Sequence, residues 1–305
     1  MSTVQIVEVG PRDGFQSVGP LIPTDRKVAV VTALYEAGLR RMEATSFVST
    51  SAVPQLADAE VVLAAAQSLP GLDPQVLIPT VRQAERALKA GARHLGFVLS
   101  VSEAHNRSNV RRSPQASVQD YRDILNLMPE GTRMRLNVAT AFDCPFGGPV
   151  PPEKTLALLD ALLEERRDIE VALCDTTGRV TPGHVASLFA AAMARFADVR
   201  AWAFHGHDTY GMGAANALAA WNAGVRVFDS SIAGLGGCPF APGATGNVAT
   251  EDLIYLFDGL GADSGVSMDA LIAVAREVTA IDGAQVGGRV RDAFAARKCR
   301  MEPVA

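Results

Sequence analysis

Cysteine is scarce in this sequence, which has four in 305 residues. They are Cys144, Cys174, Cys238 and Cys299, and no two of them form a C-x-x-C pair. This spacing excludes the usual patterns of a structural zinc site and of a small domain held together by disulfides. We therefore expect a protein of a reducing compartment.

The sequence also lacks an excess of positive charge. It has 28 Lys and Arg against 33 Asp and Glu, which gives a formal net charge of -5. Proteins that bind nucleic acid usually carry a basic surface, so no nucleic-acid partner is expected. The most basic segment, 107–112, has three arginines. Such a short run is typical of a solvated segment, or of one that meets a phosphate of an anionic cofactor.

Long apolar runs are absent as well. No stretch approaches the roughly 18 uncharged apolar residues that a membrane span requires. The sequence does not open with a basic region, an apolar core and a cleavage site, as a secretory signal would. We expect no membrane partner and a cytoplasmic location.

What the sequence does contain is a regular alternation of short β-branched runs with longer Ala- and Leu-rich helical patterns. This alternation is the signature of repeated βα units on a parallel sheet. The expected strands are residues 4–9, 41–47, 76–80, 95–101, 134–139, 169–175, 201–205 and 225–230. Eight such units predict a (β/α)₈ TIM barrel, in which the strand interiors fill a packed core.

An open doubly wound sheet is the competing fold, and it usually shows a G-x-G-x-x-G motif after its first strand. The first loop here reads GPRDGFQ over residues 10–16 instead. The next helix is expected at 24–37, with Thr24 as its N-cap and Gly38 as its stop. We assign residues 1–265 to the barrel, and 266–305 to a short C-terminal helical extension and tail packed on it.

Polar side chains stand at the ends of several predicted strands. Asp13 follows the first strand, Glu43 lies in the second, Asp175 ends the sixth, His205 ends the seventh and Asp229 lies near the end of the eighth. The carboxyl ends of barrel strands open on one mouth. These groups are therefore expected to face one another, although nothing assigns Asp229 a particular role.

His205 and His207 are the strongest candidates for metal ligands. In extended backbone, residues two apart project to the same side, as two ligands of one ion must. An isolated H-x-H is most often a pair of structural histidines, but the carboxylates expected at the same mouth need a cation to sit together. Asp13 would add a carboxylate and Asn247 an amide oxygen, a set that suits Mn²⁺, Mg²⁺, Co²⁺, Fe²⁺ or Zn²⁺. The remaining histidines have no such pattern and are expected to be structural: His94, His105 and His184.

Arg12 lies in a turn bracketed by Gly10-Pro11 and Gly14. An arginine in a loop is usually a solvated ion-pair partner. A tight turn would instead hold the guanidinium in place, where it could stabilise a developing enolate oxygen. The turn favours the second interpretation.

Residues 234–247 form a loop with five glycines, and Cys238 lies near its middle. This composition is typical of a lid hinged at both ends. A lone cysteine is often an inert buried thiol, so a thiol that donates a proton on closure and an inert thiol both remain open.

Several longer motifs resemble the 3-hydroxy-3-methylglutaryl-CoA lyases, a family of metal-dependent TIM-barrel lyases related to Claisen-type synthases. They are VEVGPRDGFQ (7–16), EATSFVS (43–49), DTTG (175–178), HGHDTYG (205–211) and DSSIAGLGGCPFAPGATGNVATED (229–252). They occur in the family's order between residues 4 and about 258. The Gly-Gly-Cys-Pro loop is much more specific than His-x-His.

The resemblance implies an acyl-CoA substrate and a divalent ion, Mg²⁺ or Mn²⁺, held by Asp13, His205, His207 and Asn247. It also implies that Arg12 polarises the thioester carbonyl, that Cys238 lies on a closing loop, and that Glu43 and Asp175 are supporting acids. The implied reaction is a retro-aldol or retro-Claisen cleavage to acetyl-CoA and acetoacetate, as in leucine degradation. The base is Asp13, His205 or a hydroxide on the ion, and Cys238 is the candidate that protonates the enolate carbon. A homo-oligomer, a dimer or a tetramer, is expected.

Departures from the family pattern bear on the substrate more than on the reaction. Ser17 and Val18 stand where Asn-Glu is common, Phe146 where Tyr is common, and Cys174 where Gly is frequent.

A synthase or aldolase that joins an acyl-CoA to a 2-oxo acid is the rival function, but such synthases usually have longer appended regions. A non-catalytic binding protein is a further rival, which would be expected to have lost Arg12, Asp13 or a histidine.

Overall fold

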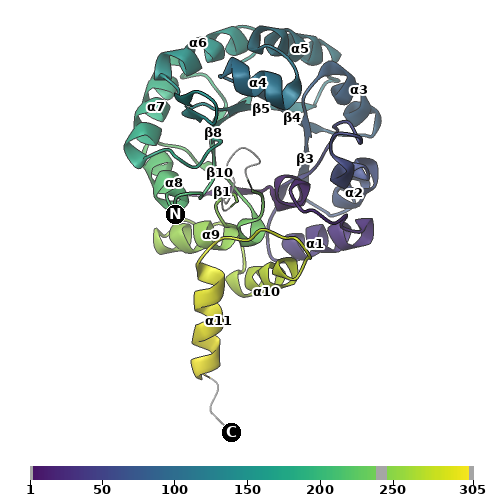
Figure 1. The fold of residues 1–305 in the computed structure, drawn as a ribbon, viewed down its shortest axis with the longest axis vertical. Coiled ribbons are helices and arrows are strands. Elements are labelled where there is room, and N and C mark those ends of the chain that lie inside the picture. Colours follow the sequence, from purple (N-terminus) through teal and green to yellow (C-terminus); the bar gives the residue numbers. More distant parts are fainter. Residues whose placement is uncertain (1–2, 238–245, 302–305) are drawn as a thin grey trace.

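Eight parallel strands close into a barrel in this computed structural model, which describes residues 3–237 and 246–301 (Figure 1). Around the barrel the order is β1-β10-β9-β8-β5-β4-β3-β2. The strands are β1 Gln5–Glu8, β2 Arg41–Ser46, β3 Asp73–Ile78, β4 His94–Ser100, β5 Arg133–Ala139, β8 Glu170–Asp175, β9 Ala201–Gly206 and β10 Val227–Ser230. The predicted TIM barrel is confirmed, and each strand lies within three residues of its expected bounds.

Helices surround the barrel and cover its outer face (Figure 1). The α-helices up to the end of the barrel are α1 Thr24–Glu36, α2 Ala59–Gln67, α3 Val81–Lys89, α4 Glu103–Val110, α5 Pro114–Leu127, α6 Pro152–Leu163, α7 Pro182–Arg195, α8 Gly213–Asn222 and α9 Thr250–Gly259. The predicted N-cap of α1 is wrong, because Pro23 takes that position. Thr24 is already helical and donates its hydroxyl to Asp58 over 2.8 Å.

Short elements interrupt the strand–helix pattern at the mouth of the barrel. A single π-helical turn, η1 Gly10–Gly14, follows β1. The 3-10 turns η2 Pro54–Leu56 and η3 Ile232–Gly234 follow β2 and β10. Two-residue strands, β6 Asp143–Cys144 and β7 Gly148–Pro149, form a small antiparallel hairpin after β5. The hydrophobic pattern of the sequence did not indicate any of them, since each is too short to show a periodicity.

The main apolar core lies between the strands and the surrounding helices. Side chains alternate along each strand, so Trp202 and Phe204 of β9 join this outer core, while Ala203 belongs to a second, smaller cluster of six residues. That small cluster contains only short side chains, such as Val7 and Ala172. The barrel interior is therefore not filled by apolar side chains alone, because buried charged side chains such as Arg41, Arg135 and Asp229 occupy much of it.

Two helices follow the barrel, α10 Met268–Thr279 and α11 Val290–Met301. Figure 1 shows α10 alongside α1, and α11 extending away from the barrel. Tyr255 of α9 packs edge-on against Phe294 of α11, with ring centroids 6.3 Å apart. Across the described residues, no helix combines the length and the apolar character that a membrane span needs.

Candidate active site

The turn after β1 places Arg12 and Asp13 at the mouth. The backbone amides of Arg12 and Asp13 both donate to the carbonyl oxygen of Val9, over 3.1 and 2.7 Å. The preceding amide of Gly10 donates to the buried Glu8 carboxylate over 2.8 Å. π-helical turns are rare and often mark functional sites. The tight turn predicted from the glycines around Arg12 is present, and it holds both side chains against the barrel.

Asp13, His205 and His207 converge in the way a metal site requires. One potential ligand atom from each of the three lies within 4.8 Å of the others. The two imidazole rings are 5.4 Å apart between centroids. Asp13 comes from the turn after β1 and the histidines from the end of β9, so the closure of the barrel brings them together.

Asn247 joins this group through a bridge between two chain segments. Residues 247 and 207 form an antiparallel bridge, and the Asn247 amide donates from Nδ2 to Asp13 Oδ2 over 2.8 Å. A Cβ on Gly236 would lie 2.6 Å from Asn247 Nδ2, and the φ of Gly236 is +103°. Glycine is therefore needed at 236, both for its backbone conformation and for the space that Asn247 occupies.

Two buried polar atoms beside Asp13 have the chemistry of metal ligands. Among the described residues, neither His207 Nδ1 nor Asn247 Oδ1 has a hydrogen-bond partner. A buried polar atom without a partner costs free energy unless something binds it. Both atoms are electron-pair donors, and together with the Asp13 carboxylate they form a nitrogen and oxygen set that fits a divalent cation.

Arg12 connects the metal-binding group to Glu43. Its guanidinium donates from Nε to Glu43 and from Nη1 to Asp13. Glu43 also accepts from Gln75 Nε2 over 3.2 Å. The pairing of β2 with β3 shifts register between Glu43 and Thr45, and such bulges often redirect a side chain beside an active site. Arg12 is thus held by carboxylates on two sides.

A cavity of about 880 Å³ opens beside these groups at the carboxyl end of the barrel. Arg12, Asp13, Glu43, His205 and His207 all line it. Its volume lies within the range of small-molecule sites, roughly 300–1,000 Å³. The mouth predicted from the polar strand ends is therefore a real cavity rather than a rim sealed by apolar packing.

Burial and charge set the protonation of the metal-binding group. Burial acts to raise the pKa of Asp13, but Arg12 and the two histidines outweigh it and hold that pKa well below its usual range. Burial lowers the pKa of His207 to about 4, with the neighbouring His205 acting in the same direction. Asp13 is thus an anion and His207 a neutral imidazole near neutral pH, the two states in which these groups bind metal.

The structure does not bring Asp175 into the cavity wall. Its carboxylate accepts from the backbone amide of Gly178 over 2.9 Å and supports the turn after β8, while its neighbour Thr176 lines the cavity. Burial raises the pKa of Asp175 to about 6, against the backbone amides that act to lower it. Cys238 lies outside the described residues, so its predicted position is not part of this geometry.

The cavity also contains residues to which the sequence gave no role. Asp229 of β10 lines it and contacts His205, and Asn137 of β5 and Cys174 of β8 line it as well. His105, expected to be structural, lies in its wall, and Gln285 reaches it from the segment between α10 and α11. The strand ends in the sequence placed Asp229 at the mouth without assigning it a role, and the register of β9 and β10 pairs it with His205. The others depend on loop paths that no local pattern reveals.

Comparisons with known proteins identify the family of this chain. A family model described as HMGL-like matches residues 3–278. The hydroxymethylglutaryl-CoA lyase of Pseudomonas mevalonii is 41% identical over 301 residues, which cover 98% of this chain and 99% of that protein. The (R)-citramalyl-CoA lyase of Chloroflexus aurantiacus is 38% identical over 294 residues, covering 93% and 92% of the two chains.

A solved structure gives the same result at the level of the fold. An HMG-CoA lyase from Acenitobacter baumannii, in complex with coenzyme A and 3-methylmalate, superposes with a TM-score of 0.90 and 35% identity, covering 99% of this chain and 98% of that one. The match of the family model to nearly the whole barrel, and of these relatives to nearly the whole chain, shows that this protein belongs to the HMGL-like family.

Proposed function

We propose that this protein is a carbon–carbon lyase that cleaves 3-hydroxy-3-methylglutaryl-CoA to acetyl-CoA and acetoacetate. The observation that carries the proposal is the convergence of Asp13, His205 and His207 within 4.8 Å, beside Arg12, in a cavity large enough for an acyl group. The names of the relatives support a lyase over a condensing synthase, and the retained Arg12, Asp13 and histidines speak against a non-catalytic binding protein.

We further propose that the site takes Mg²⁺ or Mn²⁺, held by Asp13, His205, His207 and Asn247. Asn247 Oδ1 and His207 Nδ1, which have no hydrogen-bond partner in the described part of the chain, support this set, and its carboxylate and amide oxygens suit both ions. When bound, the ion supplies a Lewis acid that makes the C3 hydroxyl of the substrate easier to deprotonate.

The protein's own residues account for the movement of charge. Cleavage breaks the bond between C2 and C3, so the hydroxyl oxygen on C3 becomes the ketone of acetoacetate and the electron pair moves to the thioester as an enolate. Arg12 stands beside the metal-binding group, where its remaining N–H groups can stabilise the enolate oxygen. Glu43 keeps the guanidinium in place through the bond from Arg12 Nε.

Two proton transfers complete the reaction. A base removes the hydroxyl proton, and the groups of this chain at that position are Asp13 and His205. An acid then protonates C2 of the enolate to give acetyl-CoA, and we propose Cys238 for this step. Asp175 acts as a supporting acid that holds the turn carrying Thr176.

The test is a panel of 3-hydroxyacyl-CoA thioesters assayed for release of acetyl-CoA. We expect the methylglutaryl thioester to be cleaved with Mg²⁺ or Mn²⁺, and activity to disappear with a chelator and return when either ion is added. Unchanged rates after exhaustive metal removal would exclude the mechanism. Failure of every thioester in the panel would exclude the lyase.

A citramalyl-CoA thioester is the second candidate substrate. It is favoured by the 38% identity with the (R)-citramalyl-CoA lyase, and by Cys174, which lines the cavity at a position where Gly is frequent in the family. The two reactions release different ketones, pyruvate from citramalyl-CoA and acetoacetate from the methylglutaryl thioester. The same panel therefore distinguishes them when the keto product is identified.

Three further expectations belong with this proposal. We propose a cytoplasmic homo-oligomer, a dimer or a tetramer, and a division of the chain into the barrel at 1–265 and the extension at 266–305. The position of Gln285 in the cavity wall supports a role for the extension in the site. Deleting the extension should therefore impair substrate binding.

A further inference from the structure

A chain of buried charged side chains begins directly behind the metal-binding group. His205 lies with Nδ1 3.1 Å from Asp229 Oδ2. The same Asp229 oxygen accepts from Arg135 Nη2 over 2.6 Å. His205 and Asp229 pair in register on β9 and β10, while Arg135 reaches them from β5 across the barrel. The site is thus connected to the barrel interior through one carboxylate oxygen.

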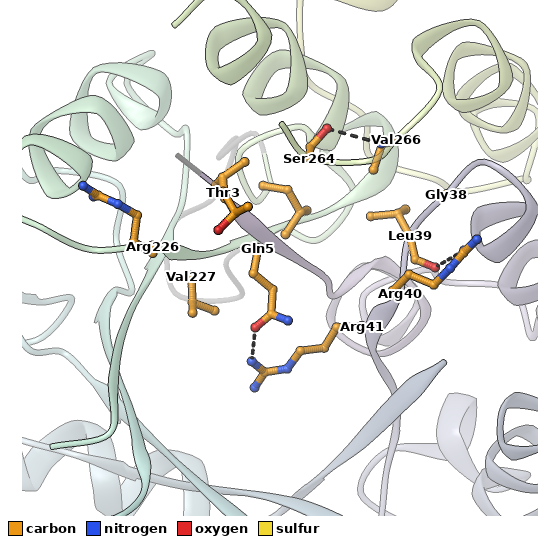
Figure 2. Close-up of a pocket in the computed structure, with 12 residues that line it drawn as sticks. Thr3, Gln5, Gly38, Leu39, Arg40, Arg41, Arg226, Val227, Ser264 and Val266 are labelled. Carbon is orange, nitrogen blue, oxygen red and sulfur yellow. Dashed lines mark hydrogen bonds between the residues drawn. The ribbon is translucent and has the colours of Figure 1, made fainter. Parts of the chain in front are cut away.

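The chain continues to the opposite end of the barrel. Arg135 Nη1 lies 3.1 Å from Glu170 Oε1, and both Glu170 oxygens accept from Arg41 over 2.7 Å. Arg41 also donates to Gln5 over 2.9 Å, and Figure 2 shows this pair in a second cavity of about 440 Å³ at the amino-terminal ends of the strands. Opposite charges alternate from Asp229 through Arg135 and Glu170 to Arg41.

Burying these charged side chains inside the barrel carries a desolvation penalty. Arg135 is 0% exposed and Asp229 is 4% exposed. Buried ion pairs are often no more stable than apolar side chains of similar size, and the interior of a TIM barrel is usually filled by Val, Ile and Leu. Fold stability alone therefore gives little reason for these charges, and their contact with His205 suggests a functional one.

We propose that Asp229, fixed by Arg135, is a positioning residue that sets the tautomer and orientation of His205. A carboxylate at Nδ1 favours the proton on that nitrogen, so Nε2 keeps the lone pair that can bind the ion or accept the hydroxyl proton. Arg135 keeps Asp229 anionic and prevents it from rotating away. The part of this inference that concerns metal affinity rests on the proposed function.

His207 offers an internal contrast. Among the described residues its Nδ1 has no hydrogen-bond partner, and no carboxylate hydrogen-bonds to either of its ring nitrogens, so no carboxylate sets its tautomer. The site therefore contains one histidine held from behind and one that is not. The effect of Asp229 should appear at His205 and leave His207 unchanged.

The first test observes the tautomer in the metal-free wild type. Nitrogen-15 NMR of the imidazole rings under mildly alkaline conditions distinguishes a proton on Nδ1 from one on Nε2, and a His205→Gln variant assigns the signals. We expect His205 to carry its proton on Nδ1. A proton on Nε2 overturns the inference, whether or not the protein is a lyase.

The second test measures Mn²⁺ affinity by electron paramagnetic resonance or calorimetry. Loss of a partner behind a histidine ligand typically weakens metal binding about 10- to 100-fold, and we expect this of Asp229→Asn and Arg135→Met. Arg135→Lys, which keeps the charge, should recover part of the loss. Arg41→Met is the matched control. It removes another buried arginine from the same series of ion pairs, but Arg41 does not contact Asp229.

The outcomes separate the two proposals. If the wild type does not bind Mn²⁺, the metal site of the proposed function fails, while the tautomer measurement still decides the inference. If the wild type binds Mn²⁺ and Asp229→Asn binds it equally well, the inference fails alone. Equal loss in Arg41→Met and Arg135→Met would show a general loosening of the barrel and also overturn it. If the Arg135 variants do not fold, the Mn²⁺ affinity of Asp229→Asn and the tautomer of His205 in the wild type still test the inference.

Discussion

Asn247 donates a hydrogen bond to Asp13 over 2.8 Å, although 234 residues separate the two in the chain. The amide nitrogen also donates to the carbonyl oxygen of Leu235 over 3.0 Å. Because both amide hydrogens are used, the orientation of the amide is fixed, and Oδ1 has no hydrogen-bond partner within residues 3–237 and 246–301. The same contact that joins the two ends of the site thus presents the oxygen that would bind the ion.

Replacing Asn247 with Ala should reduce both metal affinity and stability. The variant loses the free oxygen, and it leaves the Leu235 carbonyl and one Asp13 oxygen without their donor. An unsatisfied buried group costs about 1–3 kcal/mol. Asn216→Ala is a matched control, since Asn216 is also buried and donates to Val180 over 2.9 Å. Calorimetric titration with Mn²⁺ and urea denaturation should show a similar stability loss in both variants but weakened binding only in Asn247→Ala.

Replacing Arg12 with Gln should separate catalysis from metal binding. Loss of a preorganised donor to an oxyanion typically lowers kcat about 10²- to 10³-fold. Metal affinity should be kept or increased, because the positive guanidinium beside Asp13 repels a cation. The measurements are steady-state kinetics and Mn²⁺ titration, with Arg12→Lys as the variant that keeps the charge. A near-normal kcat in Arg12→Gln would rule out its role at the enolate.

The barrel could be predicted from the sequence because its strands are apolar on the face that meets the helices. The motif of β9, Trp202 and Phe204 alternating with Ala203 and His205, carries both the fold and the site in one strand. The carboxyl ends of the parallel strands form the mouth of the barrel. Strand position alone therefore indicated that Asp13 and His205 lie at the site.

The interior ion chain could not be predicted in this way. Arg135 and Asp229 are 94 residues apart and lie on strands that do not pair, so their contact depends on how the barrel closes. Asp175 shows a second limit of prediction from sequence. Its position at the end of its strand was predicted correctly, but its contacts were not. The turn after β8 uses its carboxylate, however, and that local hydrogen bond decides where the side chain points.

Replacing Cys238 with Ser should slow turnover without weakening metal binding. A general acid typically contributes about 10²- to 10⁴-fold, and serine is a much weaker acid than cysteine. Cys144→Ser is the control, because Cys144 is a buried thiol that the mechanism does not use. Kinetics and Mn²⁺ titration on both variants test this, and a loss of metal affinity in Cys238→Ser would contradict the assigned role.

Replacing Glu8 with Gln should change how stability depends on pH. Glu8 is fully buried, and burial raises its pKa from 4.5 to about 7, even though Thr250 and two backbone amides act to lower it. Between these values the unfolded chain loses a proton that the folded chain keeps, so this group makes the wild type less stable as pH rises from 4.5 to 7. The difference in pKa corresponds to a change on the order of 3 kcal/mol.

Gln cannot ionise, and it preserves the shape and most of the hydrogen bonds of Glu8. The free energy of unfolding of Glu8→Gln relative to wild type should therefore increase steadily across that window and then level off above pH 7. Urea denaturation at a series of pH values measures it, with the exposed Glu60→Gln as a control for removing a carboxylate. A stability difference that stays constant from pH 4.5 to 7 would mean that Glu8 ionises as it does in the unfolded chain. The carboxylate beneath the η1 and η3 turns would then be a buried negative charge.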